Sequence, residues 1–88
     1  MDNIRKKILE ILNSYIEDIE ITSEQYEDDL LTMGLDSIAF IRMVVALEET
    51  FNVEIPDEKL LITEMNTISK IEKIISFMTE RRNKVNDD

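Results

Sequence analysis

The chain has 88 residues, a formal net charge of −10 at pH 7, and neither cysteine nor histidine. The absence of both residue types excludes disulfides, zinc sites built on Cys or His, and Ser–His or Cys–His nucleophile pairs within this chain. The negative charge argues against nucleic-acid binding, which needs a positive face. No apolar run is long enough to span a membrane and no signal peptide is recognisable, so we expect a cytoplasmic protein without membrane contact.

The length predicts a single domain over residues 1–88, with its core in about residues 3–80. Apolar residues make up 43 % of the chain, and one glycine and one proline leave few breaks, which favours long helices. The charge is uneven, because residues 19–66 hold twelve acidic and only two basic side chains. Such a field steers partners of opposite charge, although a solvated surface that keeps the protein soluble is the alternative.

Helical periodicity predicts a first helix over residues 3–17, with apolar positions at Ile4, Ile8, Ile11, Leu12, Tyr15 and Ile16. Residues 18–36 show little periodicity, and we expect an ordered loop with a short turn at 23–26 or 28–32. Loops of this length in compact domains usually carry function. The adjacent Asp28 and Asp29 lack the spacing and the glycine of a calcium loop, so no metal site is predicted.

Residues 33–51 are the most informative stretch of the chain. Gly34 permits a sharp turn, Asp36 is a strong helix N-cap, and Ser37 follows as the first helical residue. The Ser37 hydroxyl would then lie at the positive end of the helix dipole, which is a favourable place for a phosphate. Ordinary capping by an Asp-Ser pair is the plainer interpretation of the same residues.

The helix predicted after Asp36 carries two apolar stripes. The core-facing stripe consists of Phe40, Met43, Val44, Leu47 and Phe51. A nearly opposite arc holds Ile38, Ile41 and Val45, with Arg42, Glu48 and Glu49 around them. A helix needs only one stripe to pack on its own core. The second stripe is therefore either covered by another segment of the chain or offered to a partner, and the pattern leaves both open.

After this helix, the alternating residues Phe51, Val53 and Ile55 lead to Pro56, which suits the first turn of a short helix through about Leu61. Asn66 or Thr67 caps a last helix, whose apolar stripe is Ile68, Ile71, Ile74, Ile75 and Met78, with Phe77 beside it. A flexible tail is predicted over residues 83–88. The fold class is therefore all-α: a small four-helix bundle, with three long helices, one short helix and a long first loop.

Ser37 has no base in this chain that could activate it, because carboxylates are poor substitutes for histidine at a serine nucleophile. An exposed serine at a helix start is better interpreted as the substrate of another enzyme than as a catalytic residue, and no catalytic residue is predicted. Asp36 would repel a phosphate on this serine, so the modifying enzyme must supply cations.

The segment Gly34-Leu35-Asp36-Ser37-Ile38 resembles the G-x-D-S-L motif of the acyl carrier and peptidyl carrier protein family. Further similar residues are Asp28-Asp29-Leu30-Leu31, Ala46-Leu47-Glu48-Glu49, Phe51, Glu54-Ile55-Pro56-Asp57 and Thr67-Ile68, so that the resemblance covers most of the chain. It implies that Ser37 carries 4′-phosphopantetheine, which a phosphopantetheinyl transferase takes from coenzyme A. It also implies that the chain is a carrier and not itself an enzyme.

The same resemblance makes the exposed stripe a docking surface. It implies that the partner-facing apolar residues are Ile38, Ile41 and Val45, that Ile55 is a further contact, and that basic patches on the partners meet Asp36, Glu48 and Glu49. The partners are the transferase and the enzymes that load and condense acyl or aminoacyl groups. Arg42 stands where fatty-acid carriers commonly have an acidic residue, which argues against exchange with fatty-acid synthase partners.

We therefore predict a discrete, monomeric carrier protein that holds acyl or aminoacyl groups as thioesters on the Ser37 arm, in polyketide or nonribosomal peptide biosynthesis. A fatty-acid carrier and a D-alanyl carrier are the alternatives within the family. The alternative from another class is an unmodified acidic helical interaction module, in which Ser37 is only a capping residue.

Overall fold

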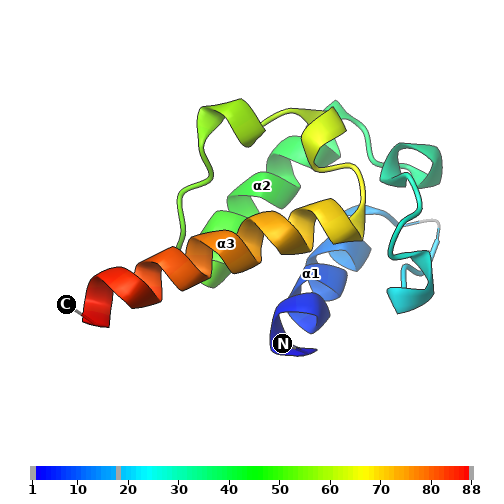
Figure 1. The fold of residues 1–88 in the computed structure, drawn as a ribbon. Helices are drawn as coiled ribbons and strands as arrows, with labels where there is room; N and C mark the ends of the chain where they lie inside the picture. The colour runs from blue at the N-terminus through cyan, green and yellow to red at the C-terminus, as the bar shows by residue number, and fades with distance from the viewer. Residues whose placement is uncertain (1, 18, 88) are drawn as a thin grey trace.

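The computed structural model describes the backbone of residues 2–17 and 19–87, and the side chains of residues 3–17 and 19–80. Its three α-helices are α1 (Asp2–Tyr15), α2 (Ser37–Phe51) and α3 (Ile68–Asp87). Four short 3₁₀ helices lie in the connections: η1 (Ser23–Gln25), η2 (Leu30–Met33), η3 (Asp57–Lys59) and η4 (Ile62–Glu64). Helix α1 packs against both α2 and α3, and Figure 1 shows the long connections at the edges of this three-helix arrangement.

The three α-helices bury one contiguous core. The fully buried side chains come from all three helices and from the connections: Ile8, Leu12, Ile21, Leu30, Met43, Leu47, Met65, Ile68, Ile71 and Ile75. The apolar periodicity that predicts the first and last helices therefore does mark their core faces. No described helix is long and apolar enough to cross a membrane.

The first connection is ordered by local hydrogen bonds, and a 3₁₀ helix forms at each of the two alternative turn positions: η1 lies within 23–26 and η2 overlaps 28–32. The side chain of Asn13 donates to the Ile21 carbonyl (2.9 Å) and accepts from the Ile21 amide (2.7 Å). Thr22 and Gln25 form a reciprocal capping box around η1. The loop is thus anchored by α1 immediately before its first 3₁₀ turn.

The short fourth helix predicted through about Leu61 is not confirmed as a single helix. The chain forms η3 and η4 instead, separated by Leu60 and Leu61, and Leu61 is extended (φ −120°, ψ 139°). Leu60 and Ile62 pack against the core, whereas Leu61 is 55 % exposed. Burial therefore alternates between neighbouring residues here. An α-helix does not give this pattern, because residues i and i+2 do not share one of its faces, and an extended backbone does.

Helix α3 begins as predicted, with Thr67 as its cap: the Thr67 hydroxyl accepts a hydrogen bond from the Lys70 amide (3.0 Å). Its backbone stays helical through Asp87, where the sequence predicts a flexible tail from residue 83. Residue 88 lies outside the described residues.

A charged cluster joins α1, the first connection and α3. The guanidinium of Arg5 pairs with the carboxylate of Glu72 (3.1 Å) and lies over the Tyr26 ring, 4.4 Å from its centroid. The Tyr26 hydroxyl also donates a hydrogen bond to Glu72. Burial alone would raise the pKa of the Glu72 carboxyl, but the hydrogen bonds from Arg5 and Tyr26 and the charge of Arg5 outweigh it and lower this pKa.

We predict that Glu72→Gln lowers the free energy of unfolding by about 1 kcal/mol at pH 7, because it removes the charge from a partly exposed pair. Because the pKa of Glu72 is lower in the folded protein, the ionised carboxylate stabilises the folded state at pH values above its unfolded pKa of about 4.3. This stabilisation is lost as the pH falls through the folded pKa. The difference between the two proteins should therefore shrink in urea titrations repeated below about pH 4. Glu10→Gln, at an exposed position on α1, is the control, and an equal loss in both variants would contradict the assignment.

Candidate functional site

The turn before α2 is fixed by a glycine and by a chain of backbone hydrogen bonds. Gly34 has φ +112°, a left-handed conformation that side chains with a Cβ rarely adopt, and its amide donates to the Leu30 carbonyl. The Leu35 amide donates to the same carbonyl (3.0 Å), and the Leu35 side chain is buried. These contacts fix the direction in which the chain enters α2, and the sharp turn predicted at Gly34 is present.

Asp36 is the N-cap of α2, and this prediction is confirmed. Its backbone is extended, and its Oδ1 accepts a hydrogen bond from the Ala39 amide (2.8 Å). The Asp36 carbonyl accepts from the Phe40 amide (2.8 Å), which is the first bond of the helical ladder. Helix α2 then runs from Ser37 to Phe51, the range predicted from the sequence.

The side chain of Ser37 is exposed, and no described residue forms a hydrogen bond with its hydroxyl. The amides of Ser37 and Ile38 also lack a hydrogen-bond partner among the described residues, because Asp36 binds only those of Ala39 and Phe40. An accessible hydroxyl beside free amides at the positive end of a 15-residue helix suits an attached phosphate. The geometry therefore fits a phosphodiester-linked group.

The second apolar stripe of α2 is open to solvent, so no described segment of the chain covers it. Ile38 is 65 % exposed, Ile41 62 % and Val45 47 %, whereas Phe40, Met43, Val44 and Leu47 of the first stripe are buried. We call the surface formed by Ile38, Ile41, Arg42, Val45 and Glu49 the open face of α2.

Charged residues border the apolar side chains of this open face. Arg42 lies four residues after Ile38 and three before Val45, so all three are neighbours on the helix surface. Its side chain is exposed and has no ion pair with a described residue. Asp36 and Glu49 are exposed as well, one before and one near the end of the helix. The three apolar side chains and Arg42 therefore lie between two exposed carboxylates, Asp36 before the helix and Glu49 near its end.

Two residues assigned to the docking surface by resemblance lie elsewhere. Ile55 is only 2 % exposed, so its prediction as a partner contact is wrong: the chain reverses at Asn52 (φ 55°) and turns the Ile55 side chain into the core. Glu48 is half-buried, and its Oε2 accepts a hydrogen bond from the Ile55 amide (2.9 Å). Glu48 therefore holds the segment after α2 in place instead of offering a free carboxylate.

Sequence reasoning also missed three exposed apolar side chains in the connections before and after α2: Ile19 (39 %), Leu31 (40 %) and Leu61 (55 %). The run Leu60-Leu61-Ile62 carries no sequence signal for Leu61, because all three residues are apolar. The structure shows that Leu61 is exposed between the partly buried Leu60 and Ile62.

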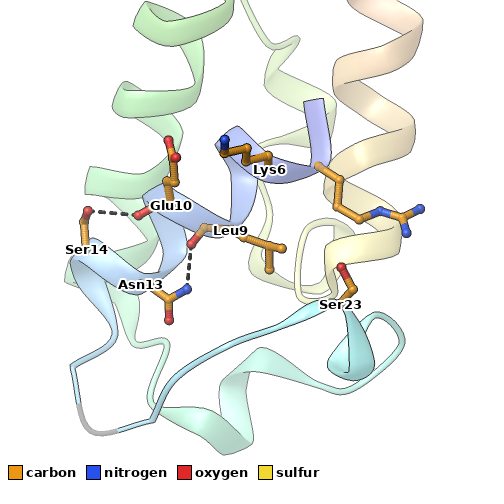
Figure 2. Close-up of a pocket in the computed structure, with 7 residues that line it drawn as sticks. Lys6, Leu9, Glu10, Asn13, Ser14 and Ser23 are labelled. Atoms are coloured by element: carbon orange, nitrogen blue, oxygen red, sulfur yellow. Dashed lines mark hydrogen bonds between the residues drawn. The ribbon is translucent and has the colours of Figure 1, made fainter. Parts of the chain in front are cut away.

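The hollow shown in Figure 2 lies between α1 and η1, and it contains neither Ser37 nor any residue of the open face of α2. The side chains of Asn13 and Ser14 donate there to the carbonyls of Leu9 and Glu10 (both 2.9 Å). The Ser14 hydroxyl bonds its own helix, and the Asn13 side chain also bonds the backbone of Ile21. These polar groups are therefore engaged within the chain, and we treat the hollow as a surface depression.

Residues 4–75 match the family described as the phosphopantetheine attachment site. Because the match covers most of the chain, the protein belongs to the acyl and peptidyl carrier protein family. It is a carrier and not an enzyme, and its cofactor is phosphopantetheine.

Individual relatives are carriers of two kinds. The chain is 41 % identical over 58 residues to the acyl carrier protein of Wolinella succinogenes, covering 66 % of this chain and 71 % of that protein. It is 37 % identical over 79 residues to the D-alanyl carrier protein of Leuconostoc mesenteroides, covering 83 % and 97 %. The acyl carrier protein of Rickettsia bellii is 27 % identical over 86 residues, covering 93 % and 90 %. No solved structure matches the chain significantly.

The opposite placement of Ile55 and Ile41 is testable by the same small substitution at both positions. We predict that Ile55→Val lowers the free energy of unfolding by roughly 1 kcal/mol, because it removes a buried methylene group. Ile41→Val, at a position that is 62 % exposed, should change it by less than about 0.5 kcal/mol. Urea denaturation followed by circular dichroism measures both, and equal effects would contradict the burial of Ile55.

Proposed function

We propose that this carrier protein bears 4′-phosphopantetheine on the Ser37 hydroxyl and presents acyl or aminoacyl groups on that arm to partner enzymes. The proposal rests chiefly on one observation: a serine with an exposed hydroxyl, free of hydrogen bonds to the described residues, stands first in α2 of a chain that matches the attachment-site family. When bound, the group supplies a thiol to which the carried group is linked as a thioester.

The role of the protein in this proposal is to display the serine and not to activate it. Gly34 and Asp36 fix the start of α2, so that the hydroxyl has a constant position relative to the helix. The positive end of the helix favours the phosphate, while the neighbouring Asp36 carboxylate opposes it. A transferase with basic residues around its active site compensates for that repulsion.

The open face of α2 is the docking surface in this proposal. Its three apolar side chains lie within three turns of Ser37 on the same helix, so a partner that binds them also reaches the arm. Basic groups on the partner would pair with Asp36 and Glu49, which are both exposed. Glu48 and Ile55 contribute only by supporting α2 and the segment that follows it.

For the pathway we propose polyketide or nonribosomal peptide biosynthesis, because the docking surface includes the exposed cation Arg42. The relatives are named acyl carrier and D-alanyl carrier proteins, which supports a fatty-acid carrier or a D-alanyl carrier as the alternative. Loading of the modified protein by malonyl-, amino-acid- and D-alanine-activating enzymes in parallel separates acyl, peptidyl and D-alanyl carriers. Transfer of D-alanine alone would favour the D-alanyl alternative, and transfer of amino acids other than D-alanine would support a peptidyl carrier. Transfer of malonate alone would exclude a peptidyl carrier, and condensation with polyketide and fatty-acid synthase partners would then separate these two kinds of acyl carrier.

We predict that incubation of the apo protein with coenzyme A and a broad-specificity phosphopantetheinyl transferase adds the mass of one phosphopantetheine. Ser37→Ala should abolish this addition, because no other hydroxyl replaces Ser37 at the start of α2. Ser23→Ala is the matched control, since Ser23 is also exposed and also stands first in a helical turn, η1. Intact-mass spectrometry measures the product.

A wild-type protein that gains no mass, or a Ser37→Ala variant that still gains it, would defeat the proposal. An unmodified interaction module would give the first of these results. The protein purified from its native host would then also lack any added mass.

We predict that Ile41→Ser lowers kcat/KM of the transferase for the apo protein about tenfold, because the loss of a central apolar contact costs about 1.4 kcal/mol. The free energy of unfolding should hardly change, because the side chain is already 62 % exposed. Phe77→Ser, at a 56 % exposed position on α3, is the control and should keep the wild-type kcat/KM. Equal losses in both variants would remove the reason to assign docking to α2.

A further inference from the structure

Two asparagines hold the connection between α1 and α2. Asn13 binds its first part through the two hydrogen bonds to the backbone of Ile21. Asn66, immediately before Thr67 at the start of α3, binds its second part through Asp29 and Leu30. Only the second part leads directly into the turn that precedes Asp36 and Ser37.

Asn66 uses three polar groups at the same time. Its backbone carbonyl accepts a hydrogen bond from the Leu30 amide (2.7 Å), and its Nδ2 donates to Asp29 Oδ1 (3.1 Å). Its Oδ1 accepts from Lys70 Nζ (3.0 Å), which also donates to the Thr63 carbonyl (2.9 Å). The Asn66 side chain thus connects the cap of η2 to Lys70 in the first turn of α3, and Lys70 in turn reaches η4.

Backbone hydrogen bonds connect Leu30 to the turn that precedes Ser37. Asp29 caps η2 by accepting from the Leu31 amide (3.0 Å), and the Leu30 carbonyl accepts from the amides of Gly34 and Leu35. Leu35 is buried and directly precedes the cap residue Asp36. The orientation of η2 therefore sets the direction from which the chain enters α2.

We propose that Asn66 is a positioning residue for the modification of Ser37, acting through Asp29 and Leu30 on the turn before α2. This inference rests on the proposed function. A transferase must bind the turn together with the start of α2 to reach the Ser37 hydroxyl. If the turn samples several orientations, the apparent affinity falls in proportion to the fraction of molecules in the correct one, so the effect is on KM.

The direct test is Asn66→Asp in the full-length apo protein, which replaces the donor to Asp29 by a carboxylate and makes the contact repulsive. With coenzyme A and a broad-specificity phosphopantetheinyl transferase, we expect KM for the carrier to rise about threefold or more and kcat to change less than about twofold. Hydrogen exchange should accelerate at the Leu30 and Leu35 amides while those of α1 keep their protection. If Asn66 only stabilised the fold, Asn66→Asp would lower the free energy of unfolding without raising KM selectively over kcat.

Two further variants identify the cause. The reciprocal pair Asp29→Asn with Asn66→Asp restores a donor and an acceptor across the same contact, and we expect KM to return close to the wild-type value. Asn13→Asp makes the same substitution in the other asparagine of the connection, and we expect KM to stay unchanged. If Asn66→Asp does not fold, Asn66→Ala takes its place, because a methyl group removes the donor to Asp29 without adding a charge.

An unchanged KM in Asn66→Asp, an equal rise in Asn13→Asp, or no recovery in the reciprocal pair would each overturn the positioning role. These outcomes differ from failure of the proposed function, in which the wild-type protein itself gains no phosphopantetheine.

Discussion

The hydrogen bond from the Ala39 amide to Asp36 Oδ1 determines where α2 begins, and most of the structure follows from that point. With Asp36 extended, Ser37 becomes the first helical residue, and every later side chain of α2 has a fixed direction. A shift of the register of α2 by one residue would turn every side chain by about 100° relative to the core, and the shift that makes Ile38 the first helical residue would place Ile41 at the buried position of Phe40. The cap thus sets both the position of the serine and the identity of the open face.

The rest of the chain stabilises this arrangement from both sides of α2. Before the helix, the left-handed Gly34 and the Asn66 contacts hold η2 against the start of α3. After the helix, Glu48 holds the amide of the buried Ile55. Neither support uses the side chains of the open face. The protein can therefore keep an apolar surface exposed on α2 while its core is closed by α1 and α3.

The sequence alone could predict the features that are encoded locally. The limits of α2, its cap and its two stripes depend on residues within one or two turns of each other, and all three predictions agree with the structure. The side to which Ile55 points could not be deduced, because alternation shows a change of face without saying which face is buried. The Asp29–Asn66 contact joins residues 37 positions apart, and no local pattern marks it. The cofactor follows from the family match, whereas the docking role of the open face remains a proposal.

The most direct measurement is to locate the attached group in protein purified from its native host. Cleavage after Lys7 and Arg42 releases a peptide that contains Ser14, Ser23 and Ser37, and tandem mass spectrometry can assign the modified residue among the three. The account predicts phosphopantetheine on Ser37 alone. A group on Ser14 or Ser23, or an unmodified peptide, would contradict it.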